Sequence, residues 1–304
     1  EFSTGLHLGQ AVGGPSLDDG KMTVNSDTLF SALAWEAVKR GKLPELVEYF
    51  RENILAVSDA LPYQNEELYL PKPVFYPGKQ RQGDPALRKK FKSIEFIPLS
   101  FFHEFLMSLK GCSMCLEKLS NEFGRMMVET KVALSGQDKP QPFHVAIWRF
   151  NKDCGLYIIV WASENEALTF LTDLLIDLGL SGIGGKLSAG LGKFTVQEIS
   201  VPQQLVSLLE NSKASFQMLL GTGLPDDANL ESVLNEGWYT IIRRGGYVRS
   251  ENYAQRQLKK RTIYMLAAGS CLKKRFIGGM FDLSDEGAHP VWRCGNTLFA
   301  GVDL

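Results

Sequence analysis

Apolar residues recur at helical spacing in two segments of the chain, and this pattern predicts a helix in each. Residues 26–40 end with two basic residues before Gly41, a pattern that stops helices, and Ser26 can cap the first turn with its side-chain oxygen. Residues 163–179 begin with the capping-box pattern Ser-Glu-Asn-Glu and end at a glycine. The apolar positions of the two predicted helices are Leu29, Phe30, Leu33, Ala37 and Val38, and then Leu168, Leu171, Leu174, Leu175 and Leu178.

Short apolar or alternating segments around these helices predict strands. The clearest two are Phe143–Phe150 and Leu156–Trp161, and the turn-like segment 151–155 predicts that they pair as a hairpin. We expect further strands at Phe2–Leu8 and Lys193–Ile199. The other predicted elements are an extended segment at Tyr69–Tyr76, a helix over 98–121, and strands at Ser215–Gly221, Trp238–Arg243, Thr262–Ala268 and Asn296–Val302.

The order of these elements predicts an α+β fold. Up to residue 200 the chain reads strand–helix–strand twice, with insertions, which is the order of a ferredoxin-like split βαβ unit. The length of 304 residues suggests two domains, since one domain takes roughly 150 residues. The α+β pattern recurs in the second half, so we expect one ferredoxin-like domain over 1–205 and another over 206–304.

Composition narrows the class of protein. Hydrophobic residues make up 44% of the chain and charged residues 22%, which fits a globular protein with a core and excludes a disordered, coiled-coil or collagen-like chain. The longest apolar stretch, Gly155–Ala162, is too short to span a membrane, and no secretory signal is visible. The chain begins at Glu1 rather than Met, so we expect that part of the first strand precedes it.

Cysteine usage points to a reducing compartment and to no metal. Five cysteines in a chain of this length suggest free thiols and a cytoplasmic protein. Cys112 and Cys115 form a lone C-x-x-C, whereas a structural zinc site needs a second pair of ligands at suitable spacing. We therefore expect no metal and no cofactor.

Positive charge is concentrated in two segments. Residues 72–93 hold seven basic residues against one acidic residue, and residues 243–275 hold ten against one, so the two segments carry +6 and +9. The formal net charge is -1, so the rest of the chain carries -16. Cationic segments attract a phosphate backbone, and Tyr247, Tyr253 and Tyr264 lie where they could stack unpaired bases. The alternative is that both segments are solvated loops and helix faces.

A glycine-rich loop lies between the second predicted helix and the strand after it. Residues 182–192 hold five glycines, which permit positive φ and let successive main-chain N–H groups surround an anion. The phosphate-binding P-loop pattern is absent because Leu187 follows Lys186, and a dinucleotide fingerprint would follow a strand. This position favours a polymer laid across the surface over a small nucleotide. A helix–strand connection without a ligand is the alternative.

Four segments of the chain resemble a known family of proteins. The segment 181–194 (SGIGGKLSAGLGKF) resembles the glycine-rich loop of the RAMP superfamily of CRISPR proteins. Three more segments are similar to the fourth subunit of the type III-A (Csm) effector complex: Asn25–Leu33, Leu61–Pro77 and Pro290–Val302. The four segments are spread along nearly the whole chain, from residue 25 to residue 302.

The resemblance implies two ferredoxin-like (RRM-like) domains, no catalytic activity and a role in antiviral defence. It implies that the chain holds the repeat-derived 5′ handle of the crRNA and contacts the large polymerase-like subunit and a backbone subunit. It also implies a thumb hairpin, for which residues 130–143 and 78–92 are candidates. The candidate RNA-binding residues are Gly184, Gly185, Lys186, Ser188, Gly190, Gly192, Lys193, His7, Arg243, Arg244, Arg249, Arg256, Lys259 and Lys260.

Two other functions remain open from the residues. In a RAMP endoribonuclease that processes repeat RNA, His7 would be the general base near a 2′-hydroxyl and Lys186 the cation for the developing charge. The chain's other histidines, His103, His144 and His289, have no evident catalytic partner. In a small-molecule enzyme, the glycine loop would hold a nucleotide phosphate.

Overall fold

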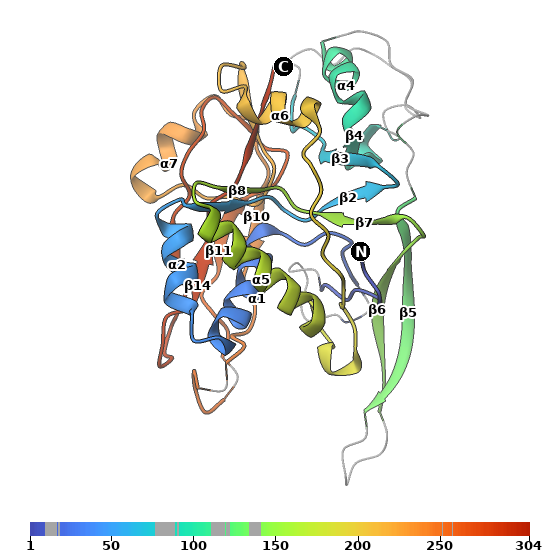
Figure 1. Ribbon diagram of the computed structural model, residues 1–304, viewed down its shortest axis with the longest axis vertical. Helices are drawn as coiled ribbons and strands as arrows, with labels where there is room; N and C mark the ends of the chain where they lie inside the picture. The colour runs from blue at the N-terminus through green and yellow to red at the C-terminus, as the bar shows by residue number, and fades with distance from the viewer. Residues whose placement is uncertain are drawn as a thin grey trace.

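The computed structural model describes residues 1–9, 17, 19–76, 89, 91–110, 119, 122–133, 141–250, 252–256 and 258–304. The protein is a mixed α/β structure with several small antiparallel sheets (Figure 1). Among the described residues, no helix is both long enough and apolar enough to cross a membrane.

Both predicted helices form and pack against each other. They are α1 (Ser26–Lys39) and α5 (Asn165–Ser181), and α2 (Leu43–Arg51) packs beside α1. Their predicted apolar faces are buried except for Val38 and Leu168, which are exposed. The predicted caps are wrong in detail because Asn25 and Glu164 occupy the cap positions and neither side chain caps its helix. The hydroxyl of Ser26 instead donates to the carbonyl oxygen of Thr222.

Strands of the first half form three separate sheets. A four-stranded sheet has the order β4 (Phe96–Pro98), β3 (Glu67–Pro71), β2 (Leu61–Gln64) and β7 (Cys154–Tyr157). Strand β1 (Leu55–Val57) pairs with β8 (Val160–Ala162). The third sheet is a long ribbon of β5 (Gly124–Ala133) and β6 (Gln141–Phe150) that extends away from the body of the molecule (Figure 1).

The predicted hairpin between Phe143–Phe150 and Leu156–Trp161 is wrong. Strand β6 pairs with β5 along its whole length, from Gly124 opposite Phe150 to Ala133 opposite Gln141. The turn 151–155 leads instead into β7, which pairs with β2, and the residues after it form β8, which pairs with β1. Each strand pairs with a partner earlier in the chain, and no local pattern encodes that choice.

Two other predicted strands form only isolated bridges. Phe2 bridges to Phe194, and Leu6 bridges to Trp148 in β6, but neither segment builds a regular ladder. The main-chain pairing between the N-terminal segment and the segment around Phe194 ends at Thr195, whose amide donates to the carbonyl oxygen of Glu1. No described residue forms a main-chain hydrogen bond with residues 196–201, so the alternating pattern there has no partner strand.

All four strands predicted in the second half are present. Strand β9 (Phe216–Leu219) lies between β12 (Cys271–Leu272) and β15 (Phe299–Val302). Strand β10 (Ile241–Arg244) pairs with β11 (Ile263–Leu266), and β13 (Met280–Asp282) pairs with β14 (Trp292–Cys294). The remaining elements are η1 (Leu99–Phe101), α4 (Phe102–Leu109), η3 (Leu187–Ala189), α6 (Gln203–Glu210) and α7 (Asp227–Leu234).

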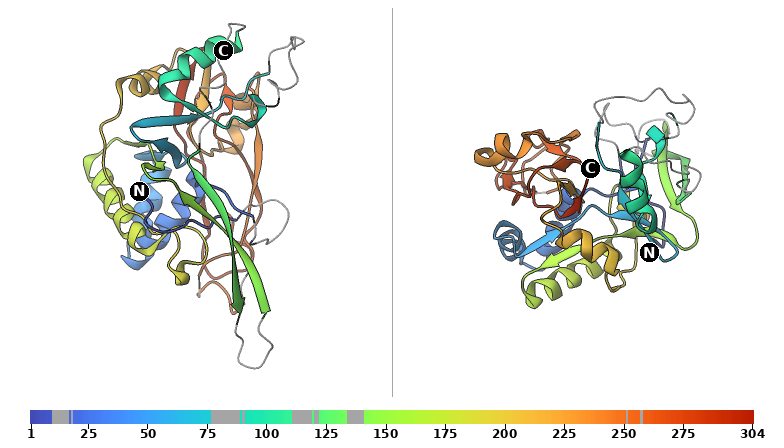
Figure 2. Two further views of the ribbon diagram at one scale, coloured as in Figure 1. Left: turned by 90° about the vertical axis from the view of Figure 1, so that its right-hand side faces the viewer. Right: turned by 90° about the horizontal axis from the view of Figure 1, so that it is seen from above.

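Two large hydrophobic clusters form the core. The first lies between α1, α2 and α5 and includes Phe30, Phe50 and Leu171. The second joins both halves of the chain, since Phe105 packs in one cluster with Met218 from β9. The β5–β6 ribbon projects from this core with its base against the N-terminal segment, as the turned view in Figure 2 shows.

Candidate nucleic-acid interface

The glycine loop, residues 182–192, is tied to the N-terminal segment by main-chain hydrogen bonds. The amide of Gly185 donates to the carbonyl oxygen of His7, and the amide of Gly192 to that of Gly5, both at 2.8 Å. The amide of Gly190 donates to the carbonyl oxygen of Leu187 within the loop, at 2.8 Å. These three amides are therefore not free to bind an anion, and the predicted anion-binding pocket of successive loop amides is wrong for them.

Close main-chain packing explains why glycine occupies two of the loop positions. A Cβ at Gly184 would lie 2.4 Å from the carbonyl oxygen of His7, and a Cβ at Gly192 would lie 2.0 Å from that of Ile183. Both residues also have positive φ. Gly190 has φ +80° but nothing within 4 Å of its Cβ position, so only its backbone conformation favours glycine.

The loop's side chains differ in their surroundings. The ammonium of Lys186 lies 4.7 Å from the centre of the Phe143 ring in β6, a cation–π distance. Ser188 and Lys193 are exposed. The loop can therefore offer a charge and a hydroxyl through its side chains, while the amides of Gly185, Gly190 and Gly192 are occupied by the fold.

His7 is buried beneath β6 and is 4% exposed. Its ring nitrogen Nδ1 lies 2.7 Å from the carbonyl oxygen of Ala146, which only accepts, so Nδ1 donates. The ring also lies against the main chain of Gly185. These contacts are those of a packing residue that joins the N-terminal segment, the glycine loop and β6.

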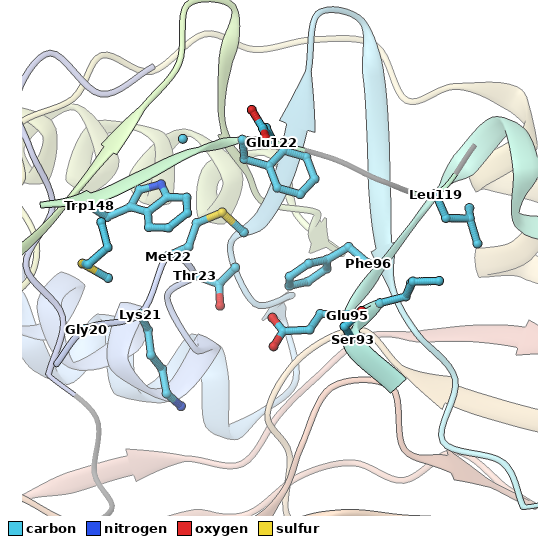
Figure 3. A pocket seen from close by; sticks show the side chains of 14 residues that line it. Gly20, Lys21, Met22, Thr23, Ser93, Glu95, Phe96, Leu119, Glu122 and Trp148 are labelled. Atoms are coloured by element: carbon cyan, nitrogen blue, oxygen red, sulfur yellow. The ribbon is translucent and has the colours of Figure 1, made fainter. Parts of the chain in front are cut away.

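A cavity of about 740 Å³ lies at the base of the β5–β6 ribbon (Figure 3). It is bounded by residues 20–23, residues 93–96 and the base of the β5–β6 ribbon. Glu95, Glu122 and Lys21 give its wall mixed charge, and the indole N–H of Trp148 is buried with no hydrogen-bond partner among the described residues. The sequence patterns gave no indication of this cavity because its walls come from three distant segments.

The second cationic segment exposes two pairs of a cation and a tyrosine. Arg243 in β10 lies directly opposite Tyr264 in β11, and both side chains are exposed. Tyr247 bridges to Lys259 further along the same ribbon, and the Lys259 ammonium lies 5.5 Å from the tyrosine ring centre. We call these four residues the cation–tyrosine strip.

Other predicted residues of this segment take different places. Tyr253 is buried at 3% exposure and packs against His289, so its predicted role in base stacking is wrong. Arg249 is exposed and lies 5.1 Å from the ring centre of Trp35. Arg256 is also exposed.

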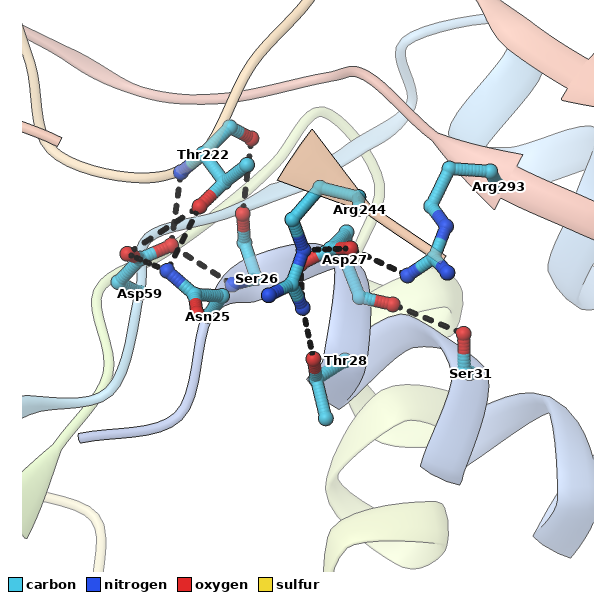
Figure 4. A network of polar contacts seen from close by, with 9 residues as sticks. All are labelled: Asn25, Ser26, Asp27, Thr28, Ser31, Asp59, Thr222, Arg244 and Arg293. Carbon is cyan, nitrogen blue, oxygen red and sulfur yellow. Dashed lines mark hydrogen bonds and ion pairs between the residues drawn. The ribbon is translucent and has the colours of Figure 1, made fainter. Parts of the chain in front are cut away.

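Arg244 points inward to Asp27, the second residue of α1 (Figure 4). Its Nε and Nη2 donate to the two carboxylate oxygens at 2.8 and 2.9 Å, and Nη2 also donates to Thr28. Arg293 in β14 donates to the same carboxylate. Burial raises the pKa of Asp27, but the charges of Arg293 and Arg244 outweigh it and lower the pKa overall.

Lys260 lies beside this ion pair. Burial, followed by the positive charges of Arg293 and Arg244, lowers its pKa to about 7 in spite of the opposite effect of Asp27. The sequence pattern did not single out Asp27 and Arg293 as members of this ion pair. Their signal was a charged residue inside an apolar segment, SDTLFSAL in one case and VWRC in the other.

A second carboxylate, that of Asp59, binds both halves of the chain (Figure 4). One oxygen accepts from the amides of Ser26 and Thr222, each at 2.7 Å, and the other accepts from the side-chain amide of Asn25 at 3.0 Å. Burial, the largest effect, raises the pKa of Asp59.

No cluster of three or more His, Cys, Asp or Glu side chains that could hold a metal occurs in the part of the chain that the structure describes. Cys112 and Cys115 lie outside the described residues. The basic insert at 78–92 also lies largely outside them, with only Lys89 and residues 91–92 described.

The fold and these surfaces define a mixed α/β protein with cations and tyrosines on an open antiparallel ribbon, a type of surface suited to single-stranded nucleic acid. Its residues 212–302 match the family model of the CRISPR Csm4 C-terminal domain. A protein of Mycobacterium tuberculosis named CRISPR system Cms protein Csm4 is 34% identical over 291 residues, which cover 95% of this chain and 93% of the relative. The protein of the same name from Streptococcus thermophilus is 31% identical and covers 96% and 95%.

The chain therefore belongs to the Csm4 family, which confirms the resemblance found in its sequence. Solved structures share the fold. The crystal structure of a Csm3–Csm4 subcomplex in the type III-A CRISPR-Cas interference complex matches with a TM-score of 0.67 at 18% identity, covering 100% of this chain and 97% of the other. A Csm1–Csm4 cassette in complex with cA4 matches with a TM-score of 0.56 at 20% identity, covering 96% and 94%.

Gly192→Ala should destabilise the protein by at least about 3 kcal/mol, because the new Cβ meets the carbonyl oxygen of Ile183. Gly190→Ala is the matched control, since it has positive φ without a contact, and should cost only about 1 kcal/mol. Urea unfolding of both variants measures the difference. Equal losses would contradict the close packing described for the loop.

Asp59→Ala should lower the free energy of unfolding by about 3 kcal/mol or more, because it leaves the buried amides of Ser26 and Thr222 without an acceptor. Asp227→Ala, at an exposed position of α7, should change it by less than about 0.5 kcal/mol. Thermal unfolding of the two variants is the measurement. A wild-type melting temperature for Asp59→Ala would show that the two halves are joined elsewhere.

Proposed function

We propose that this chain is the non-catalytic subunit of a type III-A CRISPR effector complex that anchors the 5′ handle of the crRNA and caps the base of the complex. Its membership of the Csm4 family supports a place in such a complex. The observation that carries the RNA-binding part is the cation–tyrosine strip, an exposed set of two cations and two tyrosines on one ribbon. The proposed setting is the cytoplasm of a cell that uses this complex in antiviral defence.

The chemistry of the strip suits an unpaired RNA strand. Arg243 and Lys259 can neutralise phosphates and release counterions, which makes binding salt-dependent. Tyr264 and Tyr247 offer ring faces on which bases stack, at about 1–3 kcal/mol per base. Arg249 and Arg256, both exposed, would extend the positive potential along the same segment.

The side chains of the glycine loop are proposed as a second contact with the RNA. Lys186, Ser188 and Lys193 can reach a phosphate, while the glycines of the loop keep the N-terminal segment and β6 in place. This assigns the loop's main chain a supporting role and its side chains a binding role.

We further propose two ferredoxin-like domains, divided near residue 205. The match of the C-terminal family model to residues 212–302, just beyond this boundary, supports the division. The β5–β6 ribbon is the proposed thumb, because it overlaps the candidate segment 130–143 and extends away from the body. Exposed apolar side chains along one face of it, Met126, Val128 and Val132, could pack on a neighbouring protein.

The proposed neighbours are a backbone subunit and the large polymerase-like subunit. The solved relatives support this, since their structures are of a Csm3–Csm4 subcomplex and of Csm1–Csm4 cassettes. The proposal of a non-catalytic role is supported by the burial of His7 and by the occupation of its Nδ1. A general base must reach the hydroxyl that it deprotonates.

Tyr264→Ala should weaken binding of repeat-derived single-stranded RNA to the full chain by about 1–3 kcal/mol, through loss of a stacking surface. Arg243→Ala should lower the salt dependence of binding by about one phosphate contact. Lys213→Ala, at an exposed position outside the strip, is the control and should bind like the wild type. Fluorescence anisotropy at several salt concentrations measures all three.

Wild-type affinity in both strip variants would remove the strip from the RNA surface.

Incubating the wild type and His7→Ala with repeat RNA tests the catalytic alternative. Site-specific cleavage by the wild type that His7→Ala abolishes would replace the proposed function with that of a processing endoribonuclease.

A further inference from the structure

The cavity at the base of the β5–β6 ribbon combines aromatic walls with charged side chains (Figure 3). Its volume of about 740 Å³ is within the range of small-molecule sites, roughly 300–1,000 Å³. Phe96, Phe123 and Trp148 line it together with Lys21 and Glu95. A space of this kind suits a flat ring whose orientation is fixed by a few polar groups.

The polar side chains of the cavity have unused hydrogen-bonding capacity. The ammonium of Lys21, the hydroxyl of Thr23 and the carboxylate of Glu95 make no hydrogen bond or ion pair with any residue that the structure describes. Figure 3 shows the carboxylate of Glu95 and the ring of Phe96 on the side that faces residues 21–23. The cavity therefore presents an unpaired donor and an unpaired acceptor to the same space.

Other charges nearby are engaged or point elsewhere. Burial lowers the pKa of Lys72 and the charge of Glu95 opposes this, so the two side chains are neighbours. The ammonium of Lys72, however, donates to the carbonyl oxygen of Phe91 at 2.6 Å and lies 4.5 Å from the centre of that ring. The carboxylate of Glu122 points away from the other polar groups labelled in Figure 3. Lys21 and Glu95 are thus the charges that an entering ligand meets.

This pair of opposite charges selects the class of ligand. A phosphate would gain from Lys21 but would face the carboxylate of Glu95. A cationic side chain of a protein would gain from Glu95 but would face Lys21. A neutral heterocycle with donors beside an acceptor can use both groups, while its face stacks on Phe96. The cavity therefore favours a nucleobase.

The carboxylate narrows the choice of base, because an ionised carboxylate only accepts hydrogen bonds. Guanine presents two adjacent donors, N1–H and N2–H, next to the acceptor O6. Adenine and cytosine place a ring acceptor beside their amino group, which the carboxylate would repel, and uracil has one N–H between two carbonyl groups. We propose that the cavity binds a guanine base, with Glu95 accepting from N1–H and N2–H, Lys21 donating to O6 and Phe96 stacking on the ring.

The source of this guanine is taken to be single-stranded RNA, and to that extent the inference rests on the proposed function. Proteins read an unpaired base through its Watson–Crick edge while aromatic side chains stack on its faces. The phosphates of the strand would then stay outside the cavity and away from Glu95. A free guanine nucleotide offers the same edge, so the experiment has to distinguish the two sources.

The test measures by anisotropy how the full chain binds repeat-derived RNA in which each guanine in turn is replaced by inosine, which lacks only the N2 amino group. At one position the wild type should bind about tenfold more weakly, because a hydrogen bond to a charged group is lost. Glu95→Gln should bind the guanine RNA more weakly and lose less than about twofold on inosine. The matched control Glu198→Gln, at an exposed position, should behave like the wild type.

Lys21→Met provides a second variant with a different signature. It should weaken binding of the guanine RNA but keep the inosine penalty, because O6 is present in both bases. The proposal is overturned if the wild type and Glu95→Gln lose the same affinity on inosine. It is also overturned if a wild type that binds RNA shows no penalty at any position.

A second measurement needs no RNA. Guanosine monophosphate should raise the melting temperature of the wild type and Glu198→Gln more than that of Glu95→Gln, and adenosine monophosphate should not. The same rise in all three proteins would overturn the guanine site. A larger rise with arginine amide than with guanosine monophosphate would assign the cavity to a cationic side chain of a protein and overturn it as well.

The two measurements separate the source of the base and separate this inference from the proposed function. Displacement of RNA by guanosine monophosphate at micromolar concentration would assign the site to a free nucleotide and contradict the RNA source. A wild type that binds no RNA removes the proposed function, while the melting temperatures still decide whether the cavity takes guanine. A wild type that binds RNA without any inosine penalty removes the guanine site alone.

Discussion

The buried carboxylate of Asp27 joins the two halves of this chain. It lies at the start of α1, in the first half, and holds Arg244 and Arg293, which come from two different strands of the second half. Removing one member of a buried ion pair typically costs about 3–5 kcal/mol, because the remaining charge loses its partner. Asp59, next to it, fixes the preceding turn by accepting the amides of Ser26 and Thr222. Together these two carboxylates determine how the C-terminal ribbon lies against α1.

Each of the two ribbons that carry the proposed contacts is fixed at its base by such buried groups. Strand β10 is held through Arg244, which leaves Arg243 and Tyr264 on its outer face. Strand β6 is held by the buried His7, while the glycine loop packs against the N-terminal segment that carries this histidine. Rigid anchoring at the base and open side chains beyond it are what a subunit needs to hold a flexible RNA strand in one place. The CRISPR family assignment and the geometry of the ribbons are therefore consistent with each other.

Local pattern was sufficient for the elements whose cause is local. Helices α1 and α5 and strands β9, β10, β11 and β15 follow from local apolar pattern, because the apolar residues that become buried lie within the segment itself. Pairing was not predictable in the same way: the β5–β6 ribbon depends on a partner earlier in the chain, and the turn 151–155 indicated the wrong one. The glycines of the loop were recognised, but their reason is close packing against residues 5–7, which only the structure reveals. The positive charge of Arg244 and Lys260 was visible, whereas their position around Asp27 requires contacts over more than 200 residues of sequence.

The proposed binding surface places unpaired RNA along the ribbon of β10 and β11. Ultraviolet cross-linking of the RNA that co-purifies with the full chain, followed by mass spectrometry of the cross-linked peptides, tests it directly because tyrosines in contact with bases react. If RNA lies on this ribbon, cross-links are expected at Tyr264 or Tyr247. Abundant bound RNA that cross-links only to peptides outside residues 241–266 would contradict it.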